Sequence, residues 1–136
     1  MTRLNSYLLF DSTCKEAMDF YKSVFGGERV LTTVGDSPMA KMFPPALHSR
    51  VVHARLTSDV VDIPASDWLA QNETPVGGNM SCMFLNGGPT KDLKELFEKL
   101  SEGGKITDPL QEQPFGYCGA LDDRFGVCWM FRTDQK

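Results

Sequence analysis

FGYCGALDDRFGVCWMFR, residues 115–132, is the stretch that decides the fold. Two short apolar runs, residues 117–121 and 127–131, flank the polar segment Asp122-Asp123-Arg124-Phe125-Gly126. Acidic side chains that bond their own backbone, together with a glycine free to adopt positive φ, are typical of a tight turn. The pattern therefore predicts a β-hairpin, and its aromatic, sulfur-rich second strand suits a largely buried position.

Two helices are predicted at equivalent places in the two halves of the chain. The first starts at Thr13, which forms a capping-box pattern with Glu16, and ends at Gly26-Gly27. The second has Thr90 as its expected N-cap. The apolar stripes of the two helices correspond at one constant offset: Ala17, Phe20, Tyr21 and Val24 in the first, Leu93, Leu96, Phe97 and Leu100 in the second.

Strand-like runs surround each predicted helix in the same order. They are residues 4–10, 28–34, 51–57 and 60–63 in the first half, the last stopped by Pro64, and 80–85, 105–110 and the hairpin in the second. A strand–helix–strand–strand–strand unit therefore occurs twice, which indicates a duplicated architecture. We expect one domain over residues 1–136, with units at 1–66 and 80–136 and a connection at 67–79.

Composition limits the classes of function. A chain of 136 residues with 41% hydrophobic and 24% charged residues is typical of one globular domain with a real core. The net charge of −4 argues against nucleic-acid or anionic-membrane partners, because both favour basic surfaces. No apolar run approaches the roughly 18–20 residues that span a bilayer. The N-terminus carries no signal-peptide pattern, so the expected location is the cytoplasm.

The four cysteines, Cys14, Cys82, Cys118 and Cys128, form no C-x-x-C pair, and three lie in apolar strand-like runs. This pattern favours reduced cysteines that serve as small hydrophobic residues. A disulfide or thiol chemistry is the alternative.

An ordered set of motifs resembles the PhnB-like branch of the vicinal-oxygen-chelate superfamily, which includes glyoxalase I, bleomycin-resistance proteins and extradiol dioxygenases. The branch is often called the 3-demethylubiquinone-9 3-methyltransferase domain. The motifs are YLLF at 7–10, Ala17-x-x-Phe20-Tyr21, Phe25-Gly26-Gly27, VHARL at 52–56, and Asp122-x-x-Phe125-Gly126-x-x-Trp129. The resemblance implies an α+β fold of two tandem βαβββ units, whose curved mixed sheets face a cavity. It also implies a homodimer, as in many members.

The resemblance further implies where a divalent metal would bind, through His, Gln or Glu of the first and last strands of each unit. In this chain those positions fall on Asn5 or Ser6, near Asp62, near Met80 and on Met130. A thioether is a poor ligand for the hard metals and for zinc, and Asn or Ser binds only weakly, which leaves Asn5 and Asp62 as weak candidates and predicts no cofactor. A methyltransferase activity is not supported, because we find no glycine-rich loop between strand and helix that could hold S-adenosylmethionine.

His53 and Arg55 are the main candidates for a ligand site or for catalysis. They lie on one face of the predicted strand 51–57, while Val52, Ala54 and Leu56 lie on the other and are expected to pack under the helix. An arginine can fork onto the oxygens of a small anion while a histidine acts as acid or base. A position at a dimer seam, or internal hydrogen bonding, is the alternative.

Aromatic residues add further candidates to the ligand site. Tyr7, Tyr117 and Trp129 offer flat apolar walls for an aromatic or acyl ligand, with core packing as the more frequent use of such residues. For Asp62 we expect either a structural salt bridge, with Arg55 as its partner, or plain exposure to solvent; a role as a lone metal ligand is the less favoured alternative. The connection 35–50 is either a lid or a surface excursion, and we expect its histidine to be solvated.

Three hypotheses follow for the function. The first is a small-molecule-binding homodimer of the glyoxalase/PhnB-like family that lacks the usual metal site. The second is a metal-assisted lyase, isomerase or dioxygenase with a degenerate site around His53 and Asp62. The third is a structural dimer whose cavity is filled by side chains.

Overall fold

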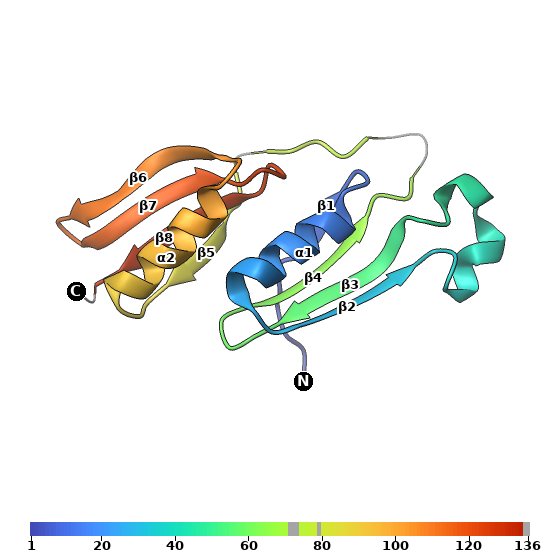
Figure 1. Ribbon diagram of the computed structural model, residues 1–136, viewed down its shortest axis with the longest axis horizontal. Coiled ribbons are helices and arrows are strands. Elements are labelled where there is room, and N and C mark those ends of the chain that lie inside the picture. Colours follow the sequence, from blue (N-terminus) through green and yellow to red (C-terminus); the bar gives the residue numbers. More distant parts are fainter. Residues whose placement is uncertain (71–73, 79, 135–136) are drawn as a thin grey trace. The chain divides into compact units, whose positions relative to one another are not determined.

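A strand, a helix and three further strands follow one another twice along the chain, as the repeat predicts (Figure 1). The structure is a computed structural model that describes residues 1–70, 74–78 and 80–134. The chain divides into two units, Met1–Val76 and Gly77–Lys136, at a point inside the predicted connection. Each unit has one α-helix on one four-stranded mixed sheet, so the fold is α+β.

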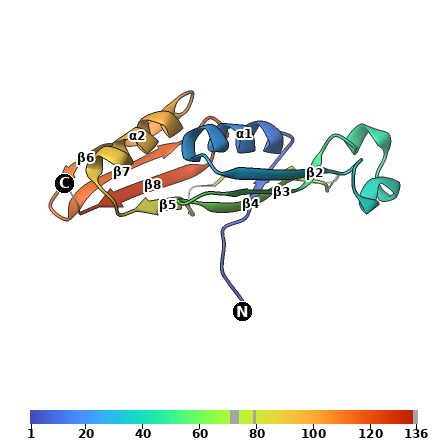
Figure 2. The ribbon, with the colours of Figure 1, turned by 60° about the horizontal axis from the view of Figure 1, so that its bottom comes forward.

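The first unit contains the sheet β1-β4-β3-β2, in which β1 is parallel to β4 and the other pairs are antiparallel. Helix α1 packs on one face of this sheet (Figure 2). The elements are β1 (Leu8–Phe10), α1 (Cys14–Phe25), β2 (Glu28–Thr33), the 3₁₀ turns η1 (Pro38–Met42) and η2 (Pro45–Leu47), β3 (Val51–Thr57) and β4 (Asp62–Asp67).

The second unit repeats this topology with the sheet β5-β8-β7-β6, in which β5 is parallel to β8. Its elements are β5 (Met83–Asn86), α2 (Thr90–Ser101), β6 (Lys105–Gln113), β7 (Gly116–Asp122) and β8 (Cys128–Thr133). Because strand order and strand directions are the same in both units, the predicted duplication is confirmed.

The two helices bury corresponding faces. In α1, Ala17, Tyr21 and Val24 are buried and Phe20 is half-buried, and the corresponding residues of α2 follow the same pattern: Leu93, Phe97 and Leu100 buried, Leu96 half-buried. The Phe97 ring meets the Phe131 ring of β8 edge-on, with centroids 5.0 Å apart. Each unit therefore has its own apolar core between its helix and its sheet.

Both helices begin differently from the sequence prediction. Thr13 is the N-cap of α1 but makes no capping hydrogen bond, so the expected capping box is wrong. The buried carboxylate of Asp67 takes its place, because its Oδ1 accepts a hydrogen bond from the Cys14 amide at 3.0 Å. In α2, Thr90 is the first helical residue and Pro89 is the N-cap.

The C-terminal end of α1 needs glycine, as predicted. Gly26 and Gly27 have φ values of 70° and 88°. A Cβ on Gly27 would also collide with the backbone carbonyl of Thr57, so the glycine lets the chain pass directly from α1 into β2 beside β3.

Several strand boundaries differ from the sequence prediction. Strand β1 starts at Leu8 instead of residue 4, and β5 starts at Met83 instead of residue 80. Strand β4 runs through Pro64, which was expected to end it. Pairing with β1 begins only at Ala65, so Pro64 lies where β4 is still an edge on that side, a position that tolerates proline.

The predicted hairpin forms between β7 and β8, and one buried carboxylate organises its turn. Asp123 Oδ1 accepts hydrogen bonds from the amides of Phe125 and Val127 at 2.8 and 3.0 Å. Its Oδ2 accepts from Trp129 Nε1 at 2.8 Å, and Gly126 has a φ of 85°. Asp123 therefore has a structural role in the turn, as the sequence pattern predicts.

The cysteines do not all remain reduced. Cys82, just before β5, forms a disulfide with Cys128 at the start of β8, whereas Cys14 and Cys118 are free. The expectation of four reduced cysteines is therefore wrong for one pair. The two residues are far apart in the sequence, and only the parallel pairing of β5 with β8 brings them together.

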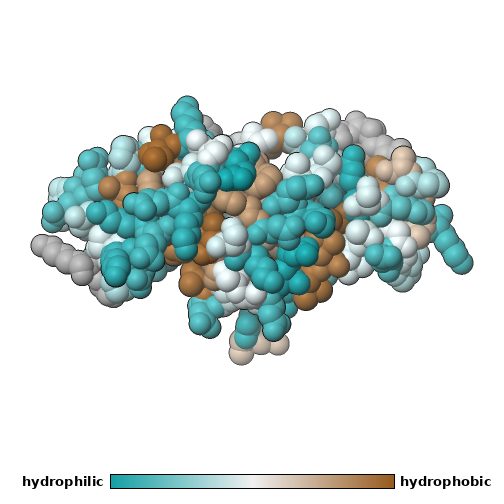
Figure 3. Space-filling model, viewed as in Figure 1, coloured by the Kyte–Doolittle hydropathy of each residue, from teal (hydrophilic) through white to brown (hydrophobic). Residues whose placement is uncertain are grey.

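The surface is mainly polar on the face seen in Figure 3, where hydrophilic residues predominate and apolar groups lie between them. Within the parts of the chain that the structure describes, no helix has the length and apolar character needed to cross a bilayer.

Candidate functional site

His53 and Arg55 lie on the face of the first sheet opposite α1. In β3 they alternate with Ala54 and Leu56, which are fully buried. A β-bulge shifts the register so that Thr32 pairs with His53 and Thr33 pairs with Val51. As a result Val51 is buried and Val52 only half-buried, which corrects the expectation that Val52 packs under the helix.

Apolar side chains from neighbouring strands share this face. Val30 of β2 pairs with Arg55 and is 57% exposed, and Leu9 of β1 is 48% exposed. We call the set Leu9, Val30, Thr32, His53, Arg55, Asp62 and Pro64 the first open face. Tyr7, which lies just before β1, is 50% exposed. Exposed aliphatic and aromatic groups beside a histidine and an arginine are suited to an amphipathic small molecule.

Arg55 and Asp62 form the predicted salt bridge. Nε and Nη2 of Arg55 donate to Oδ1 and Oδ2 of Asp62, both at 2.8 Å. This hydrogen-bonded pair lowers the pKa of the Asp62 carboxyl and raises that of the guanidinium. The arginine therefore presents its remaining Nη1 edge, and its charge is partly neutralised before any ligand arrives.

Tyr117 and Trp129 belong to the second sheet, and both lie on the face that α2 covers. Trp129 is 1% exposed, and Phe131, two residues further along the same face of β8, is buried beneath α2. Tyr117 pairs with the buried Thr133 and lies on the same face of β7 as the buried Leu121, so it belongs to the helix-covered face. Trp129 is therefore a core residue, and neither aromatic side chain extends from the uncovered face of its sheet.

The connection between β2 and β3 is ordered around His48. Its Nε2 lies 2.9 Å from the Ala40 carbonyl oxygen and 3.0 Å from that of Phe43. Carbonyl oxygens only accept, so Nε2 carries the hydrogen. The expectation of a solvated histidine is therefore wrong, and the connection consists of the two 3₁₀ turns η1 and η2, linked through this ring.

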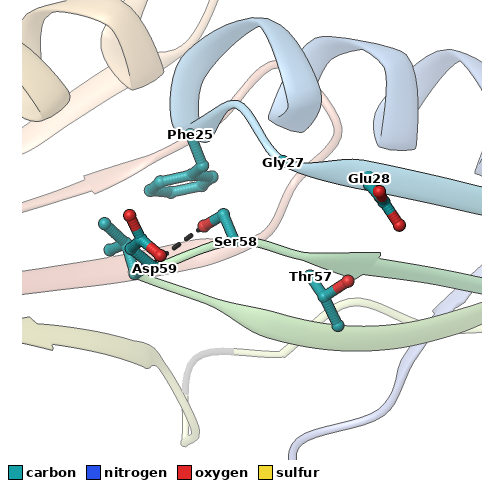
Figure 4. Close-up of a pocket in the computed structure, with 7 residues that line it drawn as sticks. Phe25, Gly27, Glu28, Thr57, Ser58 and Asp59 are labelled. Atoms are coloured by element: carbon teal, nitrogen blue, oxygen red, sulfur yellow. Dashed lines mark hydrogen bonds between the residues drawn. The ribbon is translucent and has the colours of Figure 1, made fainter.

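A surface pocket of about 470 Å³ lies where α1 ends and the β3–β4 turn begins. It is lined by Phe25, Gly27, Glu28, Thr57, Ser58, Asp59 and Val60. Figure 4 shows the Phe25 ring above Ser58 and Asp59, with Glu28 and Thr57 farther along the strands. None of the residues predicted for the ligand site lines this pocket, so it is distinct from the first open face.

Sequence reasoning missed Leu9 and Val30. A signal for Leu9 was present, because it alternates with Leu8 and Phe10 and must face away from the helix if they face it. Val30 could not be recognised in the same way, because residues 28–34 alternate only loosely.

Comparison with known proteins agrees with this geometry. The family model for 3-demethylubiquinone-9 3-methyltransferase matches residues 2–131. The chain belongs to this family. Protein PA1353 from Pseudomonas aeruginosa is 30% identical over 100% of both chains, with a TM-score of 0.88. A PhnB protein from Bacillus cereus is 25% identical over 97% of this chain and 99% of its own, with a TM-score of 0.73.

A more distant structure supports the fold alone. The glyoxylase/bleomycin resistance protein/dioxygenase domain from Frankia sp. EAN1pec is 16% identical over 98% of this chain and 97% of its own, with a TM-score of 0.63. The resemblance to the PhnB-like branch and the tandem βαβββ fold are thus confirmed. No curated protein matches the chain.

The donors at the metal positions implied by the fold do not suit a divalent ion. The structure does bring Asn5 and Asp62 together, with Asn5 Nδ2 donating to the Asp62 carbonyl oxygen at 3.3 Å. Both carboxylate oxygens of Asp62, however, are held by Arg55. In the second unit Met130 offers only a thioether. Across residues 1–70, 74–78 and 80–134, His, Cys, Asp and Glu form no group of three that could hold a metal.

The word methyltransferase in the family's name does not by itself assign that activity to this chain. Both sheets are small and mixed, with a helix against one face. A name shared through a fold is an analogy, and function has to be argued from the site.

Proposed function

We propose that this member of the 3-demethylubiquinone-9 3-methyltransferase family is a cytoplasmic, homodimeric protein that binds a small organic molecule on the first open face, without the usual metal. The observation that carries the proposal is the presence of exposed Leu9 and Val30 beside His53 and Arg55 on one sheet face. Exposed apolar groups around a few polar ones are typical of a ligand surface.

The ligand class follows from the side chains. Leu9, Val30 and Tyr7 favour an aromatic or acyl body, and His53 with the Nη1 edge of Arg55 favours an acidic or strongly hydrogen-bonding end. Asp62 competes with such an end for the guanidinium. We therefore expect a monoanionic ligand, because the pair leaves little net positive charge for a highly charged one.

Isothermal titration calorimetry with 4-hydroxybenzoate and hexanoate tests the proposal. We expect at least one probe to bind, and His53→Ala to weaken it about tenfold or more, since a charge-assisted hydrogen bond contributes about 1.5–3 kcal/mol. Lys22→Ala, an exposed change on α1, is the control and should leave binding unchanged. Equal affinities in the wild type, His53→Ala and Arg55→Ala would contradict the assignment.

The homodimer rests on membership of this family, many of whose members are homodimers. Sedimentation velocity should give twice the chain mass of 15.2 kDa. A monomer at micromolar concentration would contradict this part of the proposal.

A metal-assisted enzyme is the competing candidate. Metal analysis after dialysis separates the two, because stoichiometric Zn, Ni, Mn or Fe would favour the enzyme. The donor set around Asp62 leads us to expect no stoichiometric metal.

A further inference from the structure

The disulfide lies on the surface of the second sheet and outside its core. Cys82 and Cys128 occupy directly adjacent positions on parallel strands, with Cα atoms 4.7 Å apart, and both are half-exposed. Cys128 alternates with Trp129 and Phe131 of β8, which are buried on the α2 side. The sulfur atoms therefore lie on the opposite face, where small solutes can reach them.

Opening this bond leaves the core of the unit intact. The Cα separation of the pair equals the ordinary spacing between neighbouring strands, so the sheet can hold two thiols as well as a disulfide at these positions. The packing of Leu85, Phe97 and Phe131 is on the other face. Both redox states are therefore compatible with the same fold.

The other cysteines differ from this pair. Cys14 is fully buried in the first unit, and burial, with Asp67 and Glu16 nearby, raises the pKa of its thiol to about 12, which leaves it unreactive. Cys118 is half-buried on β7 and pairs with Arg132. Cys128 pairs with Asp122, which lies four residues further along β7, so Cys118 is not next to Cys128. The chain thus has one paired site and two isolated thiols.

We propose that Cys82 and Cys128 form a reversible redox site that exchanges with low-molecular-weight disulfides of the glutathione type, and that its state determines how firmly strand β5 is held. The inference uses the cytoplasmic location in the proposed function and is independent of the ligand. In a reducing compartment, disulfides are usually transient or redox-sensing. Exposed disulfides are also the more easily reduced ones.

The exchange balances without any other reactant. One protein thiolate attacks oxidised glutathione, forms a mixed disulfide and releases one glutathione thiolate, which takes a proton. The second protein thiolate then attacks the protein sulfur of the mixed disulfide and releases the other glutathione. Two protein thiols are oxidised to a disulfide, and one glutathione disulfide is reduced to two thiols.

Strand β5 is where the redox state has its effect. It has four residues and lies at the edge of its sheet, where β8 is its one neighbour among the described strands. The disulfide ties its N-terminal end to β8, one residue before Met83. Without the bond, that end is held by the short parallel ladder alone, and the exposed Phe84 moves with it.

The test equilibrates the full chain in glutathione mixtures from mostly reduced to mostly oxidised, quenches with acid, and counts thiols by alkylation in denaturant. We expect four alkylated cysteines at the reduced end and two, Cys14 and Cys118, at the oxidised end. Hydrogen exchange at residues 83–86 should be about tenfold faster in the reduced form, with β7 unchanged.

Substitutions of single cysteines test whether the thiol–disulfide exchange occurs at Cys82 and Cys128. Cys118→Ser should show the same transition with one thiol fewer, and Cys82→Ser should lose it and accumulate a glutathione adduct on Cys128. A disulfide that stays closed in every mixture, or one that forms in none, would overturn the redox site. Equal exchange of β5 in both states would overturn its coupling to the strand. None of these results affects probe binding to the first open face, so the two proposals fail separately.

Discussion

At the scale of single residues, three aspartates have three different roles set by their surroundings. Asp67 and Asp123 are each 4% exposed and accept hydrogen bonds from backbone amides, which hold the helix start and the hairpin turn. Asp62 is on the surface and pairs with Arg55. The two buried carboxylates stabilise the fold, because removing either leaves buried donors without partners.

Asp123→Ala should lower the free energy of unfolding by about 3 kcal/mol, because two amides and the Trp129 indole lose their acceptor. Urea unfolding followed by tryptophan fluorescence measures the change. The matched control is Asp122→Ala, a half-buried neighbour in the same hairpin, for which we expect less than about 1 kcal/mol. Equal losses of unfolding free energy at the two positions would show that the hydrogen bonds accepted by Asp123 are not the cause.

Asp62 should titrate below the ordinary aspartate value of 3.8, because Arg55 hydrogen-bonds to its charged form. Its pKa is lower in the folded than in the unfolded chain, so its contribution to stability is present above pH 3.8 and is lost as the pH falls through the folded value. A carboxyl-detected NMR titration checks this, and Arg55→Gln should return the pKa toward 3.8. An Asp62 pKa unchanged by that substitution would contradict the pairing.

At the scale of elements, the start of α1 depends on a residue far away in the sequence. Asp67 at the end of β4 accepts from Cys14, the first helical residue, and its Oδ2 accepts from the Val51 amide at 2.8 Å. One side chain thereby joins α1, β3 and β4. The second unit uses a comparable link, in which the buried Thr133 at the end of β8 donates to the Gly88 carbonyl just before α2.

We therefore expect Asp67→Ala to cost about 3 kcal/mol of unfolding free energy and Thr13→Ala less than about 0.5 kcal/mol. Thermal and urea unfolding of both variants provide the comparison. A large loss in Thr13→Ala alone would mean that the local capping box, and not Asp67, starts the helix.

The sequence predicted those elements whose signal is local and periodic. The helix stripes, the Gly26-Gly27 stop and the hairpin at Asp123 are confirmed, because each depends on neighbours within a few residues. The cap by Asp67 and the Cys82–Cys128 bond could not be predicted, since both join residues about 50 positions apart. The shift from Val52 to Val51 in the core comes from a bulge that the alternation of 51–57 does not reveal.

The candidate site was predicted in part for the same reason. Alternation alone placed His53 and Arg55 opposite the buried Ala54 and Leu56, and opposite charge indicated the pair with Asp62. The burial of Trp129 could not be predicted without knowing that the Asp123 carboxylate accepts a hydrogen bond from its indole. The hydrogen bonds of His48 could not be predicted either, because they depend on how residues 37–48 fold to bring two carbonyl oxygens to one ring nitrogen.

At the scale of the whole molecule, one architecture occurs twice with different consequences. Each unit packs a helix on one sheet face and leaves exposed apolar residues on the other. The first open face carries the histidine and the arginine, and the corresponding face of the second sheet carries the disulfide. The duplication thus provides two faces that can diverge while their cores stay alike.

The central claim is that the first open face binds a small organic molecule, and the most direct test is an amide-resolved NMR titration of the labelled protein with 4-hydroxybenzoate. We predict saturable shifts concentrated at the amides of Leu9, Val30, His53 and Arg55. Shifts confined to the pocket around Phe25 and Asp59, or spread evenly over the exposed side of α1, would contradict it.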